Sequence, residues 1–329
     1  MKPILFLIFN RVEQTKLVFE EIRKYKPSQF FIAADGPREN IQEVEICNDI
    51  RNYVIDNIDW ECEVNTLFRE KNLGCGKSVS SAITWFFEHV EDGIILEDDC
   101  LPNENFFIFC EKMLDLYKYE EKVMHISGFN YLGRIKFNNQ YIFSQFSSIW
   151  GWATWSRAWK KYIYDIELYD NLELDNKIVL NSNNDFNQLF FWRNYIKTLK
   201  EGKINTWDLQ WQLSIWFNDS VCILPNQNLV SNIGFSPDAL HTKNVESPLA
   251  TLTVDLSKIK SNFKKKKIKI STSLSDFIFY YAHYELYDLK KTEVKNKKRP
   301  IEESLYNKLK RSDLTLRDKI YLVRFHLKK

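Results

Sequence analysis

The chain of 329 residues is 44% apolar and 15% aromatic, which suffices for one large domain or two small ones and excludes a largely disordered protein. No segment approaches the ~20 apolar residues of a membrane-spanning helix. The formal charge of +2 conceals an uneven distribution, because residues 258–329 carry 21 Lys and Arg against 8 Asp and Glu, while residues 1–257 are net acidic at −11. We expect a basic C-terminal extension that either contacts an anionic surface or is simply solvated.

The start of the chain and its cysteines indicate a cytoplasmic protein. "MKPILFLIFNR" contains an apolar run of only six residues and no small-residue cleavage site, so it is a poor secretory signal. The six cysteines show neither CxxC pairing nor metal-site spacing, as expected for reduced thiols. We therefore expect a cytoplasmic protein, which the basic extension can hold peripherally at the inner face of a membrane.

The first half of the chain alternates predicted strands with predicted helices, which is typical of an α/β fold with a mostly parallel sheet covered by helices on both faces. Pro102 is expected to stop the fourth strand, and Asn103 is expected to cap the helix that follows. The strands are predicted at 3–9, 29–34, 61–68 and 93–96, and the preceding helices at 12–25, 41–56 and 76–90.

After about residue 125 the alternation loosens. The tryptophan-rich stretch 147–162 is expected to be a turn that leads into a helix, and 228–242 is expected to be a loop. Further strands are predicted at 123–130, 140–146 and 220–225, further helices at 185–200 and 206–218, and helical segments of the basic extension near 273–290 and 301–328.

Three consecutive acids, Glu97, Asp98 and Asp99, follow the buried strand "GIIL". Like charges at a buried strand end repel one another, so the cluster needs a cation or a donor-rich ligand. If the strand continues, Glu97 and Asp99 point to one side and Asp98 to the other. Carboxylate oxygens suit Mg²⁺ or Mn²⁺. The alternative is an acidic turn that is merely solvated.

The other predicted strands also end in polar residues, in "FNR", "ADGPR" and "FREKNLG", and ligands of parallel sheets bind beyond these carboxyl ends. "NLGCGKS" lacks the spacing of a phosphate loop, although Lys77 near a helix N-terminus can meet a phosphate. For Asp35 an ordinary turn is the alternative. The candidate donor-binding residues at these ends are Asn10, Arg11, Asp35, Gly36, Arg38, Asn72, Gly74 and Lys77.

The order of motifs "ILFLIFNR…ADGPR…REKNLGCGKS…GIILEDDCLPNENFF" resembles the GT-A-fold (Rossmann-like) nucleotide-sugar glycosyltransferases, and within them a bacterial family-2-like group related to N-acetylglucosaminyltransferase I. The resemblance covers roughly residues 3–242. It implies a UDP or similar nucleotide-sugar donor, Mn²⁺ or Mg²⁺, and transfer of a hexosyl or N-acetylhexosaminyl group, with inversion, to a saccharide or lipid-linked saccharide in bacterial surface glycan synthesis. It further implies a nucleotide-sugar and metal-binding half (1–125) and an acceptor-binding half of the same domain (126–245), which the basic extension expected from the composition (246–329) follows.

The resemblance also assigns roles to single residues. Asp99 corresponds to the metal-binding acid, Asp35 to the nucleotide-contacting aspartate, and Glu97 and Asp98 to acids near the donor sugar and ribose. Asp208 in "NTWDLQW" corresponds to the base that deprotonates the acceptor hydroxyl, with a helix N-terminal cap as the alternative reading.

His241 resembles a second metal ligand of some GT-A enzymes, and a plain loop histidine is the alternative. The tryptophans of 147–162 are expected in the core between the halves, but one or two aromatic rings can offer a platform to a sugar. The candidates for this acceptor contact are Trp150, Trp152 and Trp207.

Two other classes remain open from the sequence. A sugar-phosphate nucleotidylyltransferase would need a Gly-rich loop with Arg or Lys directly after the first strand, where this chain has "FNRVEQ". A non-enzymatic membrane-binding protein would explain the basic extension but not the polar strand ends. We expect no nucleic-acid partner, and a homo-oligomer stays open.

Overall fold

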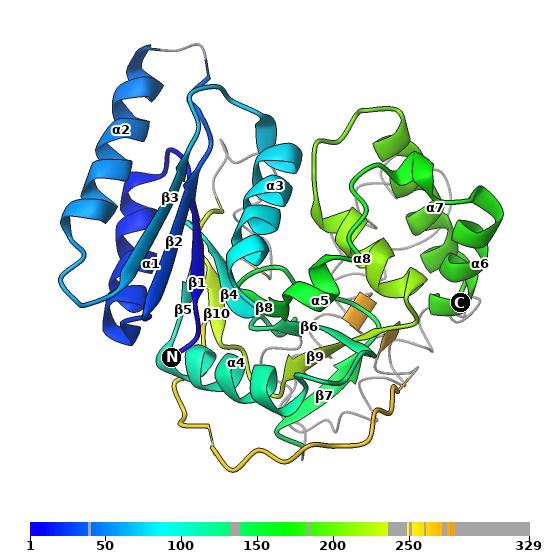
Figure 1. Cartoon of the computed structure of the whole chain (residues 1–329). Coiled ribbons are helices and arrows are strands. Elements are labelled where there is room, and N and C mark those ends of the chain that lie inside the picture. Colours follow the sequence, from blue (N-terminus) through cyan, green and yellow to red (C-terminus); the bar gives the residue numbers. More distant parts are fainter. Residues whose placement is uncertain are drawn as a thin grey trace, which may run out of the picture.

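An eight-stranded mixed sheet forms the centre of the protein, in the strand order β3-β2-β1-β4-β8-β6-β9-β7 (Figure 1). The computed structural model describes residues 1–38, 41–131, 139–182, 185–235, 249, 252–259, 261–271, 275–276 and 278–279. The strands are β1 (Ile4–Ile8), β2 (Gln29–Ala34), β3 (Glu63–Phe68), β4 (Asp92–Glu97), β6 (Val123–Ser127), β7 (Tyr141–Ser144), β8 (Trp152–Trp155) and β9 (Val221–Pro225). β7 and β8 run antiparallel to their neighbours, and the other pairs are parallel.

Helices cover both faces of this sheet, as the sequence predicts. Along β1 the side chains alternate, so that Leu5 and Leu7 belong to one apolar cluster and Ile4, Phe6 and Ile8 to the other. The first cluster includes α3 (Gly74–His89), α5 (Ser156–Trp159), α6 (Asn171–Asn181), α7 (Phe186–Lys200) and α8 (Asp208–Phe217). The second includes α1 (Val12–Tyr25), α2 (Ile41–Asp56) and α4 (Glu104–Leu116).

The α/β prediction with a mostly parallel sheet is confirmed, and the predicted elements of the first half lie within a few residues of the observed ones. The Asn103 cap is also confirmed, because its side chain accepts a hydrogen bond from the Phe106 amide at 3.2 Å. Pro102, however, does not end β4. The chain turns at Asp98 and Asp99 and then forms β5 (Cys100–Pro102), which pairs with β10 (Val230–Asn232) in a separate two-stranded sheet.

The structure of the tryptophan-rich stretch also differs from the predicted turn. Residues 152–155 form β8, an antiparallel strand between β4 and β6 in the middle of the sheet. All four residues are buried, with Trp152 in one apolar cluster and Trp155 in the other. In a strand that is buried on both faces, polar and apolar residues do not alternate along the sequence. The tryptophans of such a strand therefore cannot be told apart, from the sequence, from those of a buried turn or helix.

Part of the basic extension packs on this body. Phe263, Ile268 and Ile270 contact the second apolar cluster, and Ile270 forms an isolated parallel bridge with Phe143 of β7. The helices predicted near 273–290 and 301–328 lie almost entirely outside the described residues. In the part of the chain that is described, no helix is long and apolar enough to cross a membrane.

Candidate functional site

The acidic triplet is built around one arginine. β4 ends at Glu97, and Arg11, just before α1, directs Nη1 to Asp98 Oδ1 at 3.1 Å and to Asp99 Oδ2 at 2.5 Å. Asp98 Oδ2 also accepts a hydrogen bond from the Phe9 amide at 3.1 Å. The prediction that Asp98 and Asp99 face opposite sides is therefore wrong. Strand alternation does not extend past Glu97, because the two aspartates occupy a turn.

The cluster holds more negative charge than Arg11 neutralises. Burial, followed by the charges of Asp99 and Asp98, raises the pKa of Glu97 to about 8. Burial also raises the pKa of Asp98 to about 6, although the charge of Arg11 opposes this rise. Three carboxylates and one guanidinium leave a surplus negative charge in a poorly solvated place. A bound cation would therefore stabilise the cluster.

Asp208 lies within electrostatic range of Glu97, although it is more than a hundred residues away in the chain. It is the first residue of α8, between the buried Trp207 and Leu209, and it accepts a hydrogen bond from Thr206 Oγ1. Its negative charge contributes to the raised pKa of Glu97. The structure thus brings the predicted base within electrostatic range of the acidic triplet.

Glycines in the first turn of α3 allow this region to pack closely. The Gly76 amide donates a hydrogen bond to Asn205 Oδ1 at 2.8 Å. A Cβ at Gly76 would lie 2.6 Å from that oxygen, 2.7 Å from the Tyr164 hydroxyl and 2.8 Å from the Thr206 carbonyl oxygen. The turn therefore places the start of α3 against the segment that leads to Asp208. Lys77, on the first turn of α3, is exposed.

Asp35 joins the end of β2 to the start of α3. Its carboxylate accepts hydrogen bonds from the amides of Gly36 at 2.9 Å, Leu73 at 3.0 Å and Gly74 at 3.1 Å. Asn72 Nδ2 donates to the Gly36 carbonyl at 2.7 Å. These contacts give Asp35 and Asn72 a structural role, and for Asp35 a turn is the alternative that the sequence left open. Contact of Asp35 with a nucleotide stays a prediction.

Glu43, which sequence reasoning missed, binds residues at the neighbouring strand end. This carboxylate is only 7% exposed and accepts hydrogen bonds from Asn10 Nδ2 at 2.8 Å and from the Arg38 amide at 2.7 Å. It is also paired with the Arg38 guanidinium, which lowers the pKa of Glu43. Arg38 lies over the ring of Phe9, 5.4 Å from its centroid. Glu43 stands among other polar residues of α2, and nothing in the local sequence indicates that it binds Asn10 and Arg38.

Two of the three candidate acceptor tryptophans belong to the core. Trp152 and Trp207 are 0% and 1% exposed and stack on each other with centroids 5.6 Å apart. Neither ring presents a face to a ligand, so this prediction is wrong for both. Trp150 is half-buried and lies edge-on to Phe129 and Phe235, and it stays a candidate.

A fully buried histidine, His125, lies beside these tryptophans. Its Nδ1 accepts a hydrogen bond from Trp211 Nε1 at 3.0 Å, so Nε2 carries the proton and donates to the Ser148 carbonyl at 2.9 Å. Burial lowers its pKa from 6.5 to about 3. His125 is therefore a neutral core residue with both nitrogens occupied.

The triplet offers oxygen ligands of the kind that Mg²⁺ and Mn²⁺ prefer, and its surplus charge fits such an ion. Within the described residues, no three His, Cys, Asp or Glu side chains lie together as a ready metal site. Phosphate oxygens of a ligand would have to supply part of the coordination. His241, the second predicted ligand, lies outside the described residues.

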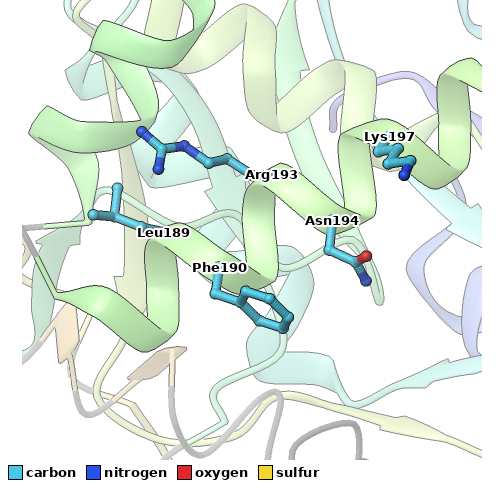
Figure 2. A pocket seen from close by; sticks show the side chains of 5 residues that line it. All are labelled: Leu189, Phe190, Arg193, Asn194 and Lys197. Atoms are coloured by element: carbon cyan, nitrogen blue, oxygen red, sulfur yellow. The ribbon is translucent and has the colours of Figure 1, made fainter.

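A separate shallow pocket of about 260 Å³ lies on α7 and is lined by Leu189, Phe190, Arg193, Asn194 and Lys197 (Figure 2). All five side chains come from successive turns of one helix. Arg193 is bound there to Asp175 through two hydrogen bonds of 2.6 and 2.8 Å. None of the strand-end residues lines this pocket, so it is not the carboxylate site.

No protein-family model matches the chain, and no curated protein matches its sequence. Among solved structures, HddC from Yersinia pseudotuberculosis is similar over 38% of this chain and 59% of that chain, with 9% sequence identity and a TM-score of 0.27. The chain thus spans less than two thirds of that protein's length. A similarity this weak supports no conclusion about fold or function.

Proposed function

We propose that the protein is a GT-A-type glycosyltransferase that depends on Mn²⁺ or Mg²⁺ and moves a sugar from a nucleotide diphosphate, UDP in the first instance, to an acceptor hydroxyl. One observation carries the proposal. The Glu97–Asp98–Asp99 cluster at the carboxyl end of β4 carries surplus negative charge, and Asp208 at the start of α8 lies close enough for its charge to act on Glu97. A mostly parallel sheet with helices on both faces and the motif order in the sequence support it.

The donor would bind beside the triplet. Asp99 is the residue assigned to the metal ion, while Glu97 and Asp98 accept hydrogen bonds from ribose and sugar hydroxyls. The ion, when bound, supplies charge neutralisation for the departing nucleoside diphosphate. The guanidinium of Arg11 keeps Asp98 and Asp99 in place, because it contacts both carboxylates.

The acceptor would bind on the α8 side of the same site. Asp208 takes the proton of the acceptor hydroxyl. The hydroxyl oxygen forms a bond to the anomeric carbon as the bond between this carbon and the nucleoside diphosphate breaks. A single base and direct displacement invert the anomeric centre. Trp150 is the remaining aromatic candidate for contact with a sugar face. A saccharide or lipid-linked saccharide of bacterial surface glycan synthesis is the proposed acceptor.

The test is a panel of nucleotide sugars, assayed by calorimetry and by slow donor hydrolysis with and without Mn²⁺. We expect Asp99→Ala to lose metal-dependent UDP binding and to keep the circular dichroism spectrum of the parent. Asp49→Ala, an exposed carboxylate of α2, is the matched control and should bind like the parent. Unchanged metal-dependent affinity in Asp99→Ala, or no binding of any nucleotide sugar by the parent protein, would refute the proposal.

A further inference from the structure

The described part of the basic extension crosses the outer edge of the sheet as an extended segment. We call residues 252–259 and 261–271 the strap. Its first part is tied to α4 and the region before it, because Asn103 Nδ2 donates to the Asp255 carbonyl at 3.0 Å and Asn105 Nδ2 to the Ser257 carbonyl at 3.1 Å. Its last part lies beside β7, at the end of the sheet order, and runs below α4 and β7 in Figure 1.

Two buried tyrosines clamp the lysine run of the strap. The hydroxyls of Tyr117 and Tyr141 lie 2.6 Å apart. Tyr141 donates to the Lys264 carbonyl at 2.7 Å, and the Lys266 amide donates to the Tyr117 hydroxyl at 2.9 Å. The backbone of Lys264 to Lys266 is therefore held in one position on the protein surface.

The clamp divides the lysines into two groups. Lys266 turns inward, with Nζ 4.3 Å from the centroid of the Tyr141 ring, and Lys265 pairs with Glu120 at 3.3 Å. Lys264, Lys267 and Lys269 are exposed, and none of the three forms an ion pair within the described part of the chain. From Lys266 onward every second side chain is half-buried, so Lys267 and Lys269 point to the same side.

We propose that the strap docks the protein on an anionic lipid surface through Lys264, Lys267 and Lys269. The three ammonium groups follow one extended segment at the edge of the sheet, which suits a broad surface of negative headgroups. Nucleic acid is a poorer fit, because the only aromatic side chain of the strap, Phe263, packs against Phe109 and Tyr141 and is not free to stack on bases.

This docking surface is separate from the carboxylate site. β7 lies four strand spacings from β4 in the sheet order, or roughly 19 Å at about 4.8 Å per spacing. The inference therefore does not depend on the proposed glycosyl transfer, and it is tested without measuring activity. Deleting the extension is a poor test, because Phe263, Ile268 and Ile270 pack against the second apolar cluster and their loss would expose it.

The experiment is sedimentation of the full chain with phosphatidylcholine vesicles, with and without 30% phosphatidylglycerol, at low salt. The test variant carries Lys264→Gln, Lys267→Gln and Lys269→Gln. The control variant carries Lys24→Gln, Lys197→Gln and Lys203→Gln. It loses the same charge at three lysines outside the strap, whose side chains are 68–73% exposed. Circular dichroism establishes that both variants are folded.

We expect binding to the phosphatidylglycerol vesicles only, and a loss of about 100-fold in the strap variant, because each lysine near an anionic surface contributes about fivefold. The control variant should bind within a few-fold of the parent. Binding should also weaken between 0.05 and 0.3 M salt, as expected for a screened charge interaction. Equal binding to both vesicle types, or equal losses in the two variants, would overturn the assignment to the strap.

Discussion

Arg11 contacts both Asp98 and Asp99 through the single nitrogen Nη1. Replacing Arg11 by Met would leave Asp98 and Asp99 without their counter-ion, so we expect a loss of about 3 kcal/mol in the free energy of unfolding at pH 7.5. The loss should shrink at pH 5.5, because the pKa of Asp98 is raised to about 6 and this carboxylate takes up a proton between the two pH values. Urea denaturation at the two pH values measures both effects.

The control for this experiment is Arg23→Met, which removes an exposed pair with Asp59 at the opposite end of α1. A clearly smaller and pH-independent loss is expected there, since solvent screens the pair. If both variants lose the same stability, the acidic triplet does not need Arg11 as its counter-ion.

Asp208→Asn should separate binding from catalysis. The amide keeps an oxygen that can accept the hydrogen bond from Thr206, but it cannot take a proton from an acceptor. We expect donor affinity within a few-fold of the parent and a transfer rate lower by about 10²–10⁴. Calorimetry with UDP and a transfer assay measure these two quantities. The control is Thr206→Val, which removes the donor of this hydrogen bond but keeps the carboxylate of Asp208. Near-normal transfer by Asp208→Asn would show that another residue is the base.

Gly76→Ala tests whether the close contact between α3 and the segment before α8 positions the site. A Cβ there meets oxygen atoms of Asn205, Tyr164 and Thr206 at 2.6–2.8 Å, so we expect a loss of about 2–3 kcal/mol in stability and weaker transfer. Gly202→Ala is the contrast. Gly202 has φ +67° but open space around it, and its replacement should cost only about 1–2 kcal/mol. A larger loss at Gly202 than at Gly76 in chemical denaturation would contradict this account.

His125 should make the protein less stable as the pH falls through 6. Its pKa is lowered from 6.5 to about 3 in the fold, so below pH 6.5 the unfolded chain takes up a proton that the native state excludes. Stability is fully present above pH 6.5 and is lost as the pH decreases. From pH 6.5 to 5.0 this contribution is about 2 kcal/mol.

The measurement is the difference in unfolding free energy between the parent and His125→Gln across this pH range. Glutamine keeps a donor and an acceptor but does not titrate. The parent should lose stability relative to the variant as the pH falls. Parallel curves would show that His125 is not held neutral in the core.

The sequence by itself determined the local elements and where the acids lie along the chain. Helix α1 at Val12–Tyr25 and strand β2 at Gln29–Ala34 have the predicted bounds, because the helical spacing of apolar residues in α1 and the short apolar run of β2 are signals carried within a few residues. The position of Glu97 at a strand end followed for the same reason. Such signals depend on neighbouring residues in the chain, so they can be recognised without knowing which segments pack together.

Only the tertiary structure decided which distant residues meet. Asp98 is 87 residues from Arg11, and Asn205 is 129 residues from Gly76. Strand β8 reads as a turn in the sequence, because its residues are buried on both faces and its pairing with β4 and β6 has no local signature. Glu43 and the strap lysines likewise acquire their positions from sheet order and side-chain packing, which arise from the whole chain and not from any short segment of it.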